Sequence, residues 1–151
     1  MESSDEFKPK IDYDNSLTSV ACSIQKYFDI PQRHKTLPEI DKLFEEKKTE
    51  NVILLLCDGL GSRVMDQILK KDDYMMKNRV KEIYAPFPPT TAAGLTSVKT
   101  GLNPAEHGWI GWFTYIEPID KIIKIYEDKV KDADIFCNND FIKIKRKIFN
   151  S

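Results

Sequence analysis

The chain has 151 residues, enough for one domain with a single core, and its composition (41% hydrophobic, 31% charged) is that of an ordinary globular protein. The 23 Lys and Arg residues nearly balance the 24 Asp and Glu residues, and the basic residues are scattered except at the end of the chain. This charge pattern predicts no nucleic-acid partner. The longest apolar run, VILLLC, is far shorter than the roughly 18 to 20 residues that cross a bilayer, and the acidic start lacks the features of a secretory signal. We therefore expect a cytoplasmic protein with no membrane partner.

The cysteines predict neither a disulfide framework nor a structural zinc site. Cys22, Cys57 and Cys137 are odd in number, widely spaced and without a C-x-x-C pair. We expect them to be reduced thiols that act as small buried hydrophobic residues.

Two helices are predicted after a loose arm at residues 1–14. Apolar residues recur at helical spacing over residues 17–28, and Pro31 closes this first helix. In the segment TLPEIDKLFEEK, Thr36 and Glu39 have the spacing of a capping box, which predicts the start of a second helix.

An alternation of strands and helices follows. Continuous apolar residues at 52–57 are typical of a strand covered on both faces, as in a parallel sheet. We expect a helix at 62–70, a short strand at 80–85 and a helix at 92–100. The inward face of the first of these helices would carry Val64, Met65, Ile68 and Leu69. The predicted fold class is therefore α/β, with a doubly wound, mostly parallel sheet flanked by helices and incomplete within this chain. Two more extended pieces are predicted at 112–116 and 122–126.

Two polar residues stand where these predicted strands end. Asp58 directly follows the 52–57 strand and Thr91 precedes the 92–100 helix, so both fall at the strand ends where α/β sheets bind ligands. Each also has a purely structural interpretation, Asp58 as a turn former and Thr91 as the N-cap of a helix that Gly101 ends. A dinucleotide-binding fingerprint fails because Val64 replaces its third glycine.

The chemical interpretation of Thr91 requires assistance from a metal. A threonine hydroxyl is too weak an acid to react unaided near neutrality, and a divalent cation held by Asp58 could activate it. The N-terminus of the following helix would favour a phosphoryl group, although it would favour other anions as well. Residue chemistry alone leaves both interpretations open.

The segments VILLLCDGLG and FPPTTAAGLTSVKTGLNPAEHGWIGW, with the spacing between them, resemble the type I phosphodiesterase/nucleotide pyrophosphatase group of the alkaline phosphatase superfamily. The resemblance covers roughly residues 11–126. It implies an alkaline-phosphatase-like fold, in which Asp58 binds one metal of a pair and Thr91 is both nucleophile and metal ligand. The implied metal is zinc, with manganese as the alternative.

The resemblance also implies a reaction. Thr91 would attack a phosphate ester or nucleotide to form a covalent threonine intermediate, which metal-activated water would then release. Gly94 stands where nucleotide pyrophosphatases often have an asparagine that touches the phosphate, so no substrate preference carries over. His107 lies in the segment TGLNPAEHG, where we expect a hydrogen-bonded structural role, and we expect Trp109 and Trp112 to be core residues. We expect no chemical role for His34.

The family's remaining metal ligands come from later segments than this chain offers, and no histidine follows His107. We therefore interpret residues 15–136 as the N-terminal part of an alkaline-phosphatase-like α/β domain. Residues 137–151 form a basic tail that could be the scar of a truncation. The expected partner is a missing C-terminal portion of the same enzyme, without which we expect no activity. The alternative is a non-catalytic module, vestigial or used for interactions, whose motif serves only capping and packing.

Overall fold

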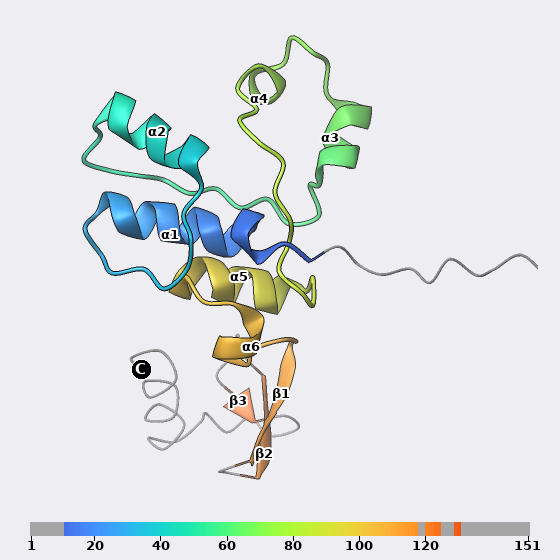
Figure 1. Cartoon of the computed structure of the whole chain (residues 1–151). Coiled ribbons are helices and arrows are strands. Elements are labelled where there is room, and N and C mark those ends of the chain that lie inside the picture. The colour runs from blue at the N-terminus through green and yellow to red at the C-terminus, as the bar shows by residue number, and fades with distance from the viewer. Residues whose placement is uncertain (1–10, 118–119, 125–128, 131–151) are drawn as a thin grey trace, which may run out of the picture.

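The structure is a computed structural model that describes residues 11–117, 120–124 and 129–130. Residues 129 and 130 are described by their backbone only. All structural statements below refer to these residues. Helices come first along the chain and a small sheet follows them (Figure 1). In chain order the elements are η1 (Tyr13–Asn15), α1 (Leu17–Tyr27), α2 (Pro38–Lys47), α3 (Ser62–Ile68), α4 (Tyr74–Lys77), α5 (Thr91–Thr100), α6 (Pro104–His107), β1 (Phe113–Ile116), β2 (Lys121–Lys124) and β3 (Lys129–Val130).

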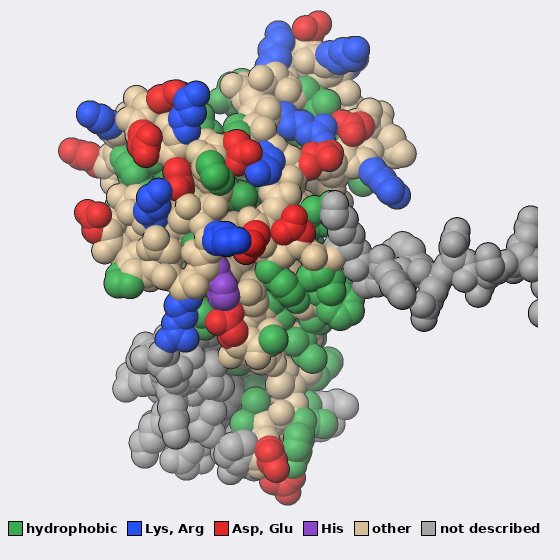
Figure 2. All heavy atoms as spheres, viewed as in Figure 1, with side chains coloured by type: hydrophobic (Ala, Val, Ile, Leu, Met, Phe, Trp, Pro, Cys, Tyr) green, Lys and Arg blue, Asp and Glu red, His purple; other side chains and the backbone are tan. Residues whose placement is uncertain are grey.

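Helices α1 and α5 pack against each other at the centre of the helical part, and α2 packs on α1 (Figure 1). Their buried hydrophobic residues are small: Ala21 and Cys22 on α1, and Ala92 and Ala93 on α5. Because the distance between packed helices depends on the side chains at their contact, these residues allow a close approach. Acidic and basic side chains are interspersed over the surface of this part (Figure 2).

The two N-terminal helices are confirmed, but the predicted capping box is wrong. Helix α2 has Leu37 as its N-cap and Pro38 in its first turn, with no side-chain capping bond. The Thr36 hydroxyl instead donates to Asp41 at 2.8 Å, and Glu39 pairs with Lys81 at 2.8 Å. Proline at the first helical position needs no partner for a backbone N–H, so α2 can begin without the box. The end of the predicted arm at 1–14 has regular structure, because η1 begins at Tyr13. Residues 1–10 of the arm lie outside the described chain.

The predicted strand at 52–57 is not formed. The segment belongs to no strand, and Ile53 and Leu55 are 93% and 82% exposed. A parallel strand needs hydrogen-bonded neighbours and a helical layer on each face. In the described part of the chain, parallel pairing is limited to one bridge between Ser16 and Tyr84. With no sheet beside it, this apolar segment lies open.

Helix α3 forms as predicted but ends two residues early. The lack of a parallel sheet in the described part of the chain explains why its expected inward face is open. Val64 and Ile68, expected to face inward, are exposed, and Met65 and Leu69 are only partly covered. The observed fold class is therefore mixed helix and strand, without the doubly wound sheet among the described residues.

The sheet that does form is antiparallel, in the order β1-β2-β3. Phe113 pairs with Lys124 and Ile116 with Lys121, while Ile123 pairs with Val130. Strand β1 confirms the extended piece at 112–116. Strand β2 covers part of the piece at 122–126, whose last two residues lie outside the described chain, as does the tail at 137–151.

His107 has the structural position that the sequence predicted. Its ring is 1% exposed between α5 and the turn after α6. The backbone N–H of Trp109 donates to Nδ1 at 3.0 Å, and Nε2 lies 3.2 Å from the Ser97 hydroxyl. Because Nδ1 accepts a hydrogen bond, the proton of the neutral ring is on Nε2. Burial lowers the pKa of His107 from its ordinary value.

Expectations for the other aromatic, histidine and cysteine residues divide. Trp109 and Cys22 are buried as predicted, whereas Trp112, 59% exposed, and Cys57 are not. Cys137 lies outside the described residues. His34 lies in the loop before α2 and pairs with Glu106 at 2.6 Å. In the described part of the chain, no helix combines the length and apolar character needed to cross a membrane.

We predict that the exposed 52–57 segment tolerates a charged side chain. Leu55→Lys should change the free energy of unfolding by no more than about 0.5 kcal/mol, as for other surface substitutions. Leu37→Lys, at a side chain only 2% exposed, is the control and should cost about 3 kcal/mol or more because it buries an unpaired charge. Urea unfolding of both variants measures this. A loss at Leu55 as large as at Leu37 would mean that the segment is packed inside a sheet.

We also predict a pH dependence from His107. Because the pKa of His107 is lowered in the fold, the unfolded chain takes up the proton more readily than the folded chain. The contribution of His107 to the free energy of unfolding is therefore present above about pH 6.5 and is lost as the pH falls below it. The comparison is between His34→Gln, which keeps His107 as its one histidine, and the double variant His34→Gln/His107→Gln, which has none. The free energy of unfolding of the single variant should exceed that of the double variant by more at pH 7.5 than at pH 5.5. An advantage that grows on acidification would contradict the buried neutral ring.

Candidate functional site

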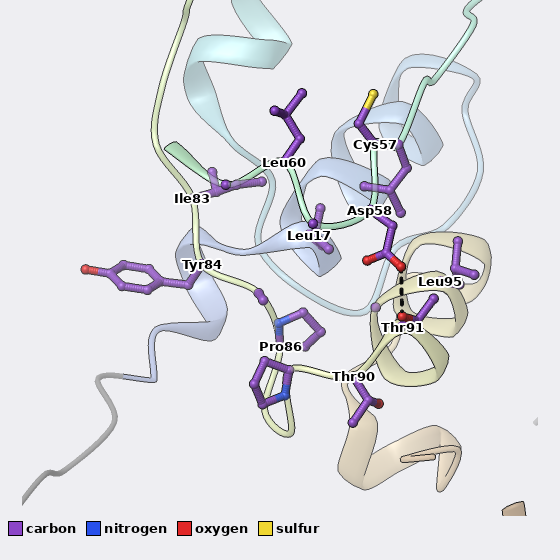
Figure 3. A pocket seen from close by; sticks show the side chains of 16 residues that line it. Leu17, Cys57, Asp58, Leu60, Ile83, Tyr84, Pro86, Thr90, Thr91 and Leu95 are labelled. Carbon is purple, nitrogen blue, oxygen red and sulfur yellow. Dashed lines mark hydrogen bonds between the residues drawn. The ribbon is translucent and has the colours of Figure 1, made fainter. Parts of the chain in front are cut away.

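A cavity of about 500 Å³ lies between the loop at 56–61, the segment at 83–86 and the N-terminal turn of α5. Figure 3 shows Asp58 and Thr91 pointing toward each other at its edge. The apolar part of the lining comes from different elements and includes Leu17, Leu56, Ile83, Pro86 and Leu95. Asp58 is the one charged residue among those that line the cavity in the described chain.

The two predicted site residues are in direct contact. The Thr91 hydroxyl donates a hydrogen bond to Oδ2 of Asp58 at 3.0 Å, across 33 positions of sequence (Figure 3). Asp58 and Gly59 form a turn after the extended segment, and Gly59 has a φ of +72°, which glycine adopts at little cost. The turn aims the carboxylate at α5. Asp58 is therefore both a turn residue and a partner of Thr91.

Thr91 is not the N-cap of its helix, contrary to the prediction. Helix α5 begins at Thr91, and its N-cap is Thr90, whose hydroxyl oxygen accepts from the backbone N–H of Ala93 at 3.1 Å. Gly101 ends the helix in the left-handed conformation as expected. Two adjacent threonines thus have different roles, since one holds the helix end and the other contacts Asp58. The sequence contains both but gives no sign of which one caps.

The wall beside Thr91 contains no polar side chain at position 94. Gly94 is buried one helical turn from Thr91, and a Cβ atom there would meet Cδ1 of Leu17 at 3.6 Å, an ordinary contact distance. The backbone space would therefore accept a side chain. The position at which an asparagine would touch phosphate is apolar in this chain.

The described residues do not by themselves fit a metal ion. They contain no group of three or more His, Cys, Asp or Glu side chains that could hold one. Asp58 and Thr91 are two ligand side chains where a zinc site needs about four ligands. Neither His34 nor His107 lines the cavity. A metal site at Asp58 and Thr91 would need further ligands from outside the described residues.

Sequence reasoning missed the role of Thr90 and the exposure of Cys57. The Thr90 hydroxyl also donates to the backbone carbonyl of Ile110 at 2.8 Å. The capping rule alone does not single out Thr90, because an N-cap hydroxyl bonds an N–H group two or three residues on, and either threonine satisfies that spacing. Cys57 lines the cavity next to Asp58, and nothing in its sequence context indicated this.

Comparison with known proteins finds a family match over the part of the chain that contains Asp58 and Thr91. The family model described as type I phosphodiesterase / nucleotide pyrophosphatase matches residues 52–142. The match begins later and ends later than the expected 11–126, so α1 and α2 lie outside it. No curated protein and no solved structure matches the chain. The matched region covers more than half of the 151 residues and includes both Asp58 and Thr91. The chain belongs to the type I phosphodiesterase/nucleotide pyrophosphatase family.

Proposed function

We propose that this chain carries the nucleophile and one metal ligand of a metal-dependent hydrolase that acts on phosphate esters. Thr91 is the nucleophile and Asp58 is the metal ligand. The observation that carries this proposal is the 3.0 Å hydrogen bond between them at the tip of α5. Membership of the family supplies the reaction class, phosphodiester or nucleotide pyrophosphate hydrolysis.

The surroundings of Thr91 suit an attack on phosphorus. Thr91 is the first residue of a ten-residue helix, whose N-terminus carries a partial positive charge that favours phosphoryl oxygens. Asp58 accepts the hydroxyl proton in a hydrogen bond and so fixes the direction of the oxygen lone pairs. Attack would form a bond between Thr91 Oγ1 and phosphorus, break the bond to the leaving alcohol, and pass the hydroxyl proton to Asp58 or to solvent.

A divalent cation would provide the activation that a threonine hydroxyl needs. Members of this family are generally metal-dependent. We propose that Asp58 and Thr91 are two of the ligands, that the metal is zinc, and that manganese is the alternative. The remaining ligands would come from outside the described residues.

The exposed segment at 52–57 suggests the source of those ligands. Its side chains are apolar on both faces and its backbone belongs to no strand of the described chain. The family match begins at Val52, the first residue of this segment. We propose that a C-terminal portion of the same enzyme adds strands beside it, which would complete both an alkaline-phosphatase-like parallel sheet and the metal site. An unpaired apolar strand is a suitable template for such pairing.

The substrate class in the proposal comes from the family, and the other parts come from composition. The substrate is a small phosphate ester or nucleotide, and neither nucleic acid nor membrane is a partner. The protein acts in the cytoplasm. The alternative, a non-catalytic module whose motif only caps and packs α5, is supported by the lack of a third ligand among the described residues.

We predict that zinc binding depends on Asp58. Titration calorimetry should show weak zinc binding to wild type that Asp58→Ala lowers by about tenfold or more, since even outer partners of metal ligands are worth about 10- to 100-fold in affinity. Asp72→Ala is the control, because Asp72 is a carboxylate 95% exposed on the surface. Equal heats from Asp58→Ala and wild type would remove Asp58 as a ligand.

We further predict that Thr91 can be labelled but not turned over. Incubation with bis(4-nitrophenyl) phosphate and zinc should release at most about one equivalent of 4-nitrophenol and leave a 4-nitrophenylphosphoryl adduct on Thr91, because the groups for release are incomplete. Mass spectrometry of peptides locates the adduct. Thr91→Ser should retain the label and Thr91→Val should lose it. Wild-type protein that binds zinc through Asp58 but never acquires a label would favour the non-catalytic alternative.

A further inference from the structure

The hydroxyl of Thr90 makes two hydrogen bonds that tie the start of α5 to a distant loop. Its oxygen accepts from the backbone N–H of Ala93 at 3.1 Å, and its proton goes to the carbonyl of Ile110 at 2.8 Å. Ile110 follows Trp109, which is buried and whose backbone N–H donates to Nδ1 of His107. Thr90 therefore joins the start of α5 to the loop at Ile110.

This arrangement decides which threonine contacts Asp58, since both line the cavity. An N-cap hydroxyl turns back toward the N–H groups of its own helix. Had Thr91 capped α5, its oxygen would face Gly94 and not Asp58. Because Thr90 takes the cap, Thr91 becomes the first helical residue and its hydroxyl donates to the Asp58 carboxylate instead.

We infer that Thr90 is a positioning residue for the nucleophile. It fixes the residue at which α5 begins, and through that it fixes the side-chain rotamer of Thr91. The inference rests on the proposed role of Thr91 for its catalytic meaning. The rotamer itself can be measured without any reaction.

The fold provides a matched control for this inference. Ser16 is the N-cap of α1, and its hydroxyl likewise makes one bond of each kind, accepting from Thr18 N–H at 3.2 Å and donating to the Tyr13 carbonyl at 2.9 Å. Ser16→Ala therefore removes the same set of interactions as Thr90→Val, but at another helix. A general loss of stability should be similar in the two variants.

The experiment measures the three-bond couplings from the backbone nitrogen and carbonyl carbon of Thr91 to its γ-methyl carbon, which report the χ1 rotamer. In wild type, Thr90→Ser and Ser16→Ala, we expect the couplings of a single rotamer. In Thr90→Val we expect them to move toward the mean over several rotamers. Thr90→Gly keeps the test open if Thr90→Val does not fold, because glycine is tolerated at N-caps but has no hydroxyl.

Two results would overturn the inference. One is a single unchanged rotamer of Thr91 in both Thr90→Val and Thr90→Gly. The other is rotamer averaging in Ser16→Ala equal to that in Thr90→Val, which would make the effect one of general destabilisation.

Labelling with bis(4-nitrophenyl) phosphate separates this inference from the proposed function. If wild type is labelled, Thr90→Val should react about tenfold or more slowly, since small misplacements of reacting groups have large effects on rate. Thr90→Ser should restore the rate. If wild type is never labelled, the proposed function fails, and the coupling measurement alone decides whether Thr90 positions Thr91.

Discussion

The hydrogen bond from Thr91 to Asp58 joins two segments that are 33 residues apart in the sequence. One is an exposed loop after an apolar run, and the other is the first turn of a well-packed helix. Without this contact, Asp58 would be one more exposed aspartate and Thr91 one more helix-terminal threonine. With it, the chain places a hydroxyl, a carboxylate and a helix N-terminus at the edge of one cavity, which are groups that the proposed phosphoryl transfer would use.

The rigid side of this contact is provided by α5. Ala92, Ala93 and Gly94 are buried directly after Thr91, which brings the first turn of the helix against α1. The other end is fixed by Gly101 in the left-handed conformation. The buried His107 attaches α6 to α5 through Ser97. Thr91 therefore projects from a helix that is anchored along its length, whereas Asp58 and both of its sequence neighbours are exposed to solvent.

The sequence predicted those features that depend on local interactions. Helices α1, α2, α3 and α5 form where apolar spacing and end signals place them, because periodicity and chain-breaking residues act within a few positions. The closeness of Asp58 and Thr91 was also expected, although the strand ends from which it was derived do not form among the described residues. Local signals did not distinguish Thr90 from Thr91 as the N-cap, because both have the same side chain and nearly the same spacing to the N–H groups of the first turn.

The largest errors of prediction concern interactions with distant partners. The run at 52–57 has the composition of a buried strand, yet composition cannot provide the neighbouring strands that would bury it, and Ile53 and Leu55 are exposed. The inward face of α3 is open for the same reason. Thr36 and Glu39 have capping-box spacing, but the Thr36 hydroxyl donates to Asp41 within α2, and Glu39 pairs with Lys81, 42 residues further along the chain. Such choices depend on the three-dimensional arrangement and not on spacing.

The claim that Asp58 and Thr91 can share one cation is tested most directly by paramagnetic broadening with manganese. Mn²⁺ added in small amounts to labelled protein should broaden the signals of the Asp58 side chain and the Thr91 methyl group together, and before those of other carboxylates. Asp58→Ala should abolish the effect at Thr91. Broadening that spreads over the exposed acidic side chains while the Thr91 methyl signal stays sharp would contradict the shared site.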